Sequence, residues 1–260
     1  MKFLVQKIDN KLTLDFCHEL MVSQIYAKWR GENFTIKYVN DGKVPENIKR
    51  PQQYIPIGTV EFVRGYIERY FPDKKECLKP LNVPDCLRVY AGRYVWNIVD
   101  PYSDKDDYAT VKSLFSDNFK EGDRLYRKSL YKIKDENNGL IIFDPNKLEE
   151  IAGYQVSKEI SPKILSEWRV FVYHDDIQQV CYYDGDPIVF PDAHRIRRMV
   201  DEYSNNNAPI AYTLDVCVTE YGTYVMECHR FFSCGLYGFS DYRKLPYMFS
   251  QAWFEMMSLD

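Results

Sequence analysis

The sequence predicts an α+β fold whose second half is a mostly antiparallel sheet. From about residue 108 onward, short runs of alternating apolar and polar residues are separated by turn-forming residues, which is typical of hairpin-connected strands. Apolar residues recur at helical spacing near the N-terminus and again at the C-terminal end. The sequence contains no internal repeat and no low-complexity stretch.

The first 90 residues mix short strands with helices. The chain starts on a strand-like run, Met1 to Val5, which polar residues then interrupt. Gly31 ends the first predicted helix, and Thr59 suits the N-cap position of the second. After the opening strand, the predicted elements are a helix over 12–30, a strand over 34–39, a polar, proline-bounded loop over 45–56 and a helix over 60–70.

Residues 81–107 are rich in turns and aromatic residues, and we interpret them as a connection leading into a second unit. Most of the elements beyond this connection are strands joined by hairpin turns. The predicted strands cover 108–112, 125–133, 140–143, 154–160, 168–173, 177–183, 211–219 and 223–227, and the predicted helices cover 192–203 and 241–257.

The composition excludes several classes of protein. The 260 residues carry 34 Lys and Arg against 38 Asp and Glu, a net charge of −4, which argues against a general nucleic-acid or membrane-surface binder. No apolar run approaches the ~18 residues of a membrane span, and the opening strand lacks the apolar region of a secretory signal. The number of cysteines, seven, is odd, and no CxxC motif occurs, so we expect free thiols instead of a disulfide framework. Free thiols are typical of a cytoplasmic protein, which is what we expect here.

Two adjacent predicted strands carry side chains that can bind a metal ion. Asp215 lies in an apolar strand, and Glu227 and His229 lie at the end of the next strand, on one face. The short turn between the strands brings Asp215 close to that pair. Converging carboxylates repel each other unless a cation or a proton separates them, and oxygen ligands suit Mg²⁺. Alternatively, backbone or arginine partners satisfy both carboxylates, and His229 is a hydrogen-bonded structural residue.

Two further segments carry charged groups on predicted strands. Lys112 ends a strand before a polar loop, where it can act as a point charge for a phosphate or simply reach solvent. Glu167 and Arg169 flank Trp168 and therefore share a face. The carboxylate can accept hydrogen bonds from ribose hydroxyls, and the guanidinium can pair with a phosphate or a carboxylate. Alternatively, these residues form a cross-strand ion pair that contributes little.

Taken in this order, the segments resemble the ATP-grasp superfamily, and most closely its small RimK-like clade found in bacteria and phages. The most specific parts of the resemblance are the Glu-Trp-Arg strand and the glycine-containing stretch near the C-terminus. Two positions depart from the family pattern, because Ser113 replaces a proline and His229 replaces an asparagine. The similar stretches are Pro56–Val63, Pro80–Pro84, Val111–Ser113, Gln155–Ile160, Ser166–Val172, Leu214–Val216, Met226–His229 and Ser233–Phe239.

The resemblance implies an ATP-grasp fold, in which two mostly antiparallel sheets clamp the nucleotide after a small α/β pre-grasp region. The pre-grasp region would cover 1–90, and the ATP-grasp domain would cover 91–260 as two interlocked subdomains, about 91–160 and 161–260. ATP and Mg²⁺ are the implied cofactors. In this resemblance, the phosphates would be contacted by Lys112 and Lys120, and adenine would be held by a hinge of Ser157, Lys158, Glu159 and Ile160. Glu167 would lie near the ribose, and Arg169 would lie near the phosphates or the acceptor. The metal would be held by Asp215, Glu227 and His229.

The activity implied by the resemblance is ATP-dependent ligation of a carboxylate to an amine, on small-molecule or peptide substrates, with Lys112 and Arg169 as the catalytic residues. One alternative is a degenerate ATP-grasp protein that binds a nucleotide or a protein partner without ligation. His229 and the single glycine in the loop over 113–122 favour that alternative. Another is a phosphotransferase on the same scaffold. A metal-dependent nuclease is disfavoured, because the chain lacks a concentrated basic groove.

Overall fold

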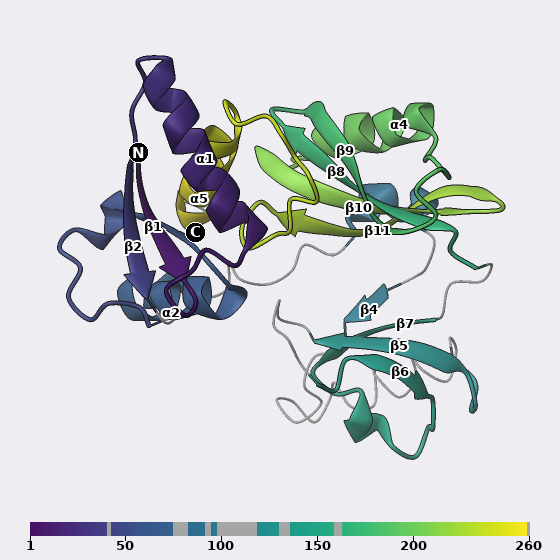
Figure 1. The fold of residues 1–260 in the computed structure, drawn as a ribbon. Helices are drawn as coiled ribbons and strands as arrows, with labels where there is room; N and C mark the ends of the chain where they lie inside the picture. Colours follow the sequence, from purple (N-terminus) through teal and green to yellow (C-terminus); the bar gives the residue numbers. More distant parts are fainter. Residues whose placement is uncertain are drawn as a thin grey trace.

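Figure 1 shows the computed structural model, which combines helices with three sheets. The structure describes residues 1–40, 43–74, 83–91, 95–97, 119–129, 136–158 and 163–258. In this part of the chain, one sheet has three strands and two sheets have four strands each. The combination of helices with antiparallel sheets confirms the predicted α+β class. None of the described helices is both long and apolar enough to cross a membrane.

The N-terminal sheet is parallel, with strand order β2-β1-β3. Its strands are β1 (Lys2–Lys7), β2 (Thr35–Asn40) and β3 (Ile55–Ile57). The central strand β1 contains the consecutive apolar residues Phe3, Leu4 and Val5, all fully buried, as expected for a strand that helices cover on both faces. The helices around this sheet are α1 (Asp15–Trp29), α2 (Val60–Tyr70) and the C-terminal α5 (Leu245–Ser258). Residues from the two ends of the chain therefore share one core.

The N-terminal elements confirm the predicted helices and correct one loop. The Thr59 hydroxyl accepts a hydrogen bond from the Phe62 N–H, as predicted for an N-cap. The loop expected over 45–56 is wrong at its C-terminal end, where Ile55 and Ile57 are buried in β3 after a short 3-10 helix, Pro51–Gln53. Pro56 is accommodated because β3 is an edge strand. The sequence Asn40-Asp41-Gly42 after β2 is typical of a turn, and Asp41 and Gly42 lie outside the described residues.

A small antiparallel sheet has strand order β4-β7-β5-β6. Its strands are β4 (Val95–Asn97), β5 (Arg124–Ser129), β6 (Gly139–Ile142) and β7 (Tyr154–Lys158). A compact core that includes Leu125, Val156 and Phe143 lies against it. The strands predicted over 125–133 and 154–160 are confirmed as far as they are described, and the strand predicted over 108–112 lies outside the described residues.

The large antiparallel sheet has strand order β11-β10-β8-β9. Its strands are β8 (Ser166–Tyr173), β9 (Asp176–Gly185), β10 (Ala211–Thr219) and β11 (Gly222–Arg230). One face packs against α4 (Ala193–Ser204) through alternate apolar residues such as Val170, Leu214 and Val216. Because side chains alternate along a strand, the charged residues between these positions point to the opposite face.

The boundaries of the last two helices show how local chemistry sets a helix start. The Asp192 carboxylate accepts hydrogen bonds from the N–H groups of His194 and Arg195, so Asp192 is the N-cap and α4 begins at Ala193, one residue later than predicted. The helix expected over 241–257 begins later, at Leu245. A turn precedes it, in which the Asp241 carboxylate accepts from nearby backbone N–H groups.

Candidate functional site

The centre of the site is a buried pair formed by Asp215 on β10 and Arg169 on the neighbouring strand β8. The two residues are directly opposite each other in the register of the strands. The Arg169 Nε and Nη2 atoms donate to the Asp215 Oδ1 and Oδ2 atoms, at 2.7 Å each. Arg169 Nη1 also donates to the Gly235 carbonyl oxygen at 3.0 Å. Burial alone would lower the pKa of Arg169, but the bond to Asp215 raises it, so the guanidinium stays charged.

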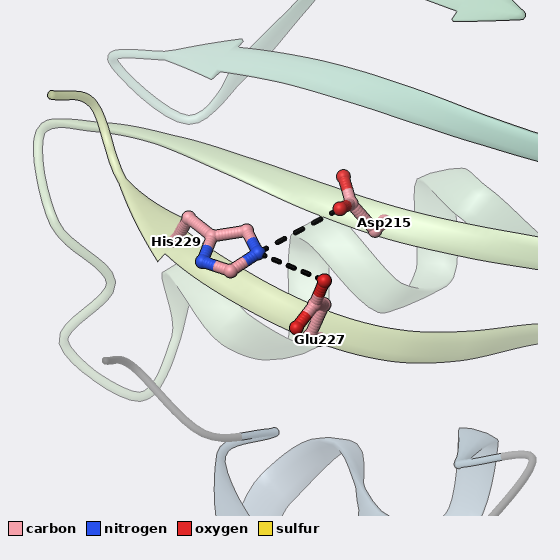
Figure 2. Close-up of side chains that lie close together, drawn as sticks. All are labelled: Asp215, Glu227 and His229. Atoms are coloured by element: carbon pink, nitrogen blue, oxygen red, sulfur yellow. Dashed lines mark ion pairs between the residues drawn. The ribbon is translucent and has the colours of Figure 1, made fainter. Parts of the chain in front are cut away.

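Glu227 and His229 on β11 complete an acidic cluster with Asp215, as Figure 2 shows. Glu227 is the register partner of Asp215, and a β-bulge follows this pair. His229 Nε2 lies 3.1 Å from Glu227 Oε1 and 3.7 Å from Asp215 Oδ2. One potential ligand atom from each residue lies within 4.8 Å of the others. The prediction that these three side chains converge is therefore confirmed, and Cys228 between them is buried on the opposite face.

A lysine from the small sheet reaches this cluster. Lys128 on β5 forms an ion pair through its Nζ atom with Glu227 Oε2. Burial by itself would raise the pKa of Glu227, but attraction to His229 and Lys128 lowers it well below its usual range. Lys128 could not be predicted as a site residue from the sequence, because a strand lysine usually reaches solvent. Only the relative placement of two sheets brings it here.

Two tyrosines surround the Arg169 guanidinium. The Arg169 Cζ atom lies 4.9 Å from the ring centroid of Tyr237 and 5.9 Å from that of Tyr183. The two rings stack with centroids 4.9 Å apart and an interplanar angle of 23°. The Tyr183 hydroxyl donates to Glu167 Oε2 at 2.7 Å. Burial and the nearby carboxylates raise the pKa of Tyr183, so it acts as a neutral hydrogen-bond donor.

The segment 233–239 carries Tyr237 to this position. Tyr237 has a left-handed backbone (φ 47°), and a Cβ atom added at Gly235 would lie 2.9 Å from the Tyr237 ring. The Asp15 carboxylate at the start of α1 accepts from the N–H groups of Leu236 and Tyr237. The Ser233 hydroxyl donates to the Gly58 carbonyl oxygen at 2.7 Å. The N-terminal elements therefore hold this segment against the site.

The remaining predicted site residues lie on or near the small sheet or outside the described part of the chain. Lys158 Nζ lies 3.0 Å from Asp123 Oδ2, the oxygen that also accepts from the Lys120 N–H. Ser157 is buried on β7. Lys158 is opposite Leu125, whereas Gln155 is opposite Lys128, so Lys158 and Lys128 lie toward opposite ends of the β5–β7 pair. Lys112, Glu159 and Ile160 lie outside the described residues.

The donor set at the acidic cluster fits a divalent cation. Asp215 and Glu227 supply carboxylate oxygens, which are the ligands that Mg²⁺ prefers. His229 Nε2 lies between them, and its Nδ1 atom is buried without a hydrogen-bond partner among the described residues. Each carboxylate oxygen has a second lone pair, so the bonds to Arg169 and Lys128 do not exhaust it. These two cations currently partner the carboxylates, as the structural interpretation predicted for Asp215.

Comparisons with known proteins show a likeness to ATP-grasp domains. Residues 123–245 match the model of an ATP-grasp domain, R2K clade family 2. The structure is similar to the D-alanine–D-alanine ligase from Bacillus anthracis, with a TM-score of 0.54, 11% identity and 98% of each chain covered. The same enzyme complexed with ATP gives 0.52, 13% identity and coverage of 100% and 99%. The ATP-grasp ligase PsnB with a minimal precursor gives 0.51, 10% identity and coverage of 96% and 98%. At these identities the likeness is one of fold, and no curated protein matches the sequence.

Proposed function

Because the chain belongs to the ATP-grasp superfamily, we propose that it is an ATP- and Mg²⁺-dependent carboxylate–amine ligase that forms an amide through an acylphosphate. The observation that carries the proposal is the convergence of Asp215, Glu227 and His229 beside the buried Arg169, on strands inside the matched ATP-grasp region. Two anionic ligands next to a fixed guanidinium suit a metal-bound triphosphate.

The roles proposed for the other residues follow from their positions. Glu167, held by the Tyr183 hydroxyl, would accept hydrogen bonds from the ribose. Ser157 and Lys158 at the end of β7, with the adjoining Glu159 and Ile160, would form the adenine hinge. Lys112 and Lys120 would contact the phosphates. Residues 1–90 would act as a pre-grasp region that contributes to acceptor recognition, because Asp15 and Gly58 hold the segment beside Arg169.

In the proposed reaction, an oxygen of the acceptor carboxylate attacks the γ-phosphorus of ATP while the bond to the bridging oxygen breaks and ADP leaves. The amine nitrogen then attacks the acyl carbon, inorganic phosphate leaves, and the nitrogen gives up a proton. Mg²⁺, when bound by Asp215 and Glu227, would offset the negative charge of the phosphates. Arg169 and Lys112 would direct fixed positive charge at the same oxygens. Positioning supplies much of the acceleration, so no nucleophilic side chain is needed.

The test is the release of ADP and phosphate across a panel of carboxylates and amines. Ligation predicts release only when both substrates are present, together with an amide product. Glu227→Gln should lower the rate by about 10²–10³-fold, as for loss of a group that stabilises transition-state charge. Glu220→Gln is the matched control, because it removes the same charge from the exposed tip of the same hairpin. Asp215→Asn should also abolish turnover, but it leaves Arg169 unpaired and is expected to destabilise the fold.

The alternative functions give different results in the same assay. Binding of ATP without turnover on any substrate pair would support a nucleotide-binding protein that has lost ligation. ADP formation with a phosphorylated product and no amide would support a phosphotransferase. The absence of any thermal shift with ATP and Mg²⁺ would remove the nucleotide assignment altogether.

A further inference from the structure

We propose that Lys128 is the resident cation of the acidic cluster: it neutralises Glu227 while the site is empty of metal, and it moves onto phosphate oxygens when ATP and Mg²⁺ enter together. The inference rests on the proposed function. It adds that the protein discriminates against free Mg²⁺, and it names the side chain responsible.

The Glu227 carboxylate already has a partner on each of its two oxygens. Its two carboxylate oxygens are each engaged by a nitrogen donor, Oε1 by His229 Nε2 and Oε2 by Lys128 Nζ. Glu227 retains 27% of its side-chain exposure and Lys128 retains 37%, whereas Asp215 retains 2%. Lys128 and Glu227 are therefore the more exposed of these groups, and a metal ion that binds Glu227 has to compete with the Lys128 ammonium group.

The charges of the cluster oppose the binding of a metal ion without a nucleotide. Arg169 balances Asp215, and Lys128 balances Glu227, so these two ion pairs, leaving His229 aside, have no net charge. A divalent cation added alone would meet the positive charges of Arg169 and Lys128 at short range, which opposes its binding. A metal–nucleotide complex brings anionic phosphates, which can accept Lys128 as it leaves Glu227. The site should therefore bind Mg²⁺ and ATP with positive coupling.

The Lys128–Glu227 ion pair connects two different sheets. Lys128 belongs to β5 in the small sheet and Glu227 to β11 in the large sheet (Figure 1). Their ion pair therefore joins the two sheets. Transfer of the ammonium from Glu227 to a phosphate keeps a link between the sheets but routes it through the nucleotide. Loading of the site thus exchanges one cross-sheet contact for another.

The experiment is isothermal titration of the full chain with MgCl₂ alone, with ATP in EDTA, and with ATP in excess Mg²⁺. In Lys128→Met, which removes the charge but keeps most of the side-chain length, Mg²⁺ alone should bind about tenfold more tightly than in the wild type. The factor by which Mg²⁺ tightens ATP binding should fall by about the same amount, because the coupling is reciprocal. Lys128→Arg should keep most of the wild-type coupling, because it retains the positive charge.

Lys147→Met is the matched control, because Lys147 is an exposed lysine paired with Glu150 away from the cluster. It should behave as the wild type in all three titrations. Equal or unmeasurable binding of Mg²⁺ alone in the wild type and Lys128→Met would overturn the proposal, provided that melting curves show both proteins folded. If the wild type binds no ATP under any condition, the proposed function fails instead, and the titration with Mg²⁺ alone still decides the role of Lys128.

Discussion

Arg169 lies at the centre of the site and has contacts with several of its groups. Three of its five N–H groups are engaged by Asp215 and the Gly235 carbonyl oxygen. Up to two N–H groups are therefore left for a substrate oxyanion. Because Arg169 is 93% buried, these donors cannot swing freely toward solvent, and their direction is set by the groups packed against the guanidinium. Of the two tyrosine rings described beside it, that of Tyr237 is the nearer.

We expect Tyr237 to position Arg169 rather than to react. Tyr237→Ala should lower kcat/KM for the acceptor by about tenfold, the size expected for loss of a partly desolvated cation–π contact. Tyr237→Phe keeps the ring and should stay within about twofold of the wild type. The apparent affinity for ATP should change little in either variant, as measured by steady-state kinetics with each substrate varied in turn. An equal loss of activity in Tyr237→Phe would contradict this role.

At the scale of residues, the sequence predicts the acidic cluster but not the side chains that reach it from other elements. Alternation along two strands with a short turn places Asp215, Glu227 and His229 together, and the structure confirms it. Lys128 and Tyr237 could not be found in this way. Their positions depend on how a second sheet and the segment 233–239 meet the first sheet, which no local pattern encodes.

At the scale of elements, turn and capping chemistry fix the boundaries that the sequence predicts best. The β10 strand and the α2 helix match their predicted ranges, because a glycine-containing turn and a threonine cap mark their ends. The β3 strand was missed. It has only three residues with a proline in the middle, and it exists because Ile55 and Ile57 are buried beside β1. Burial of this kind is a tertiary effect that local propensity does not report.

The cap of α2 gives a prediction about stability. Thr59→Ala removes the acceptor of the Phe62 N–H and should lower the free energy of unfolding by about 1 kcal/mol. Thr59→Ser retains the hydroxyl and should recover most of that loss. Urea denaturation followed by circular dichroism measures both variants. An unchanged midpoint in Thr59→Ala would show that the cap contributes nothing measurable to the stability of the fold.

At the scale of the whole molecule, elements from both ends of the chain pack together and support the site. The C-terminal helix α5 packs into the core of the N-terminal region, and Asp15 at the start of α1 holds the segment that carries Tyr237. The net charge of −4 argues against a broad basic surface, yet two cations, Arg169 and Lys128, lie at the acidic cluster. The composition alone could exclude classes of function, but it could not reveal this local concentration of charge.

The most direct test is a crystal structure of the protein with a non-hydrolysable ATP analogue and Mn²⁺, located by its anomalous signal. We predict one ion in contact with carboxylate oxygens of both Asp215 and Glu227 and with phosphate oxygens, and Lys128 moved from Glu227 to a phosphate. A bound nucleotide whose ion lies away from both carboxylates, with the Lys128–Glu227 pair intact, would contradict the account.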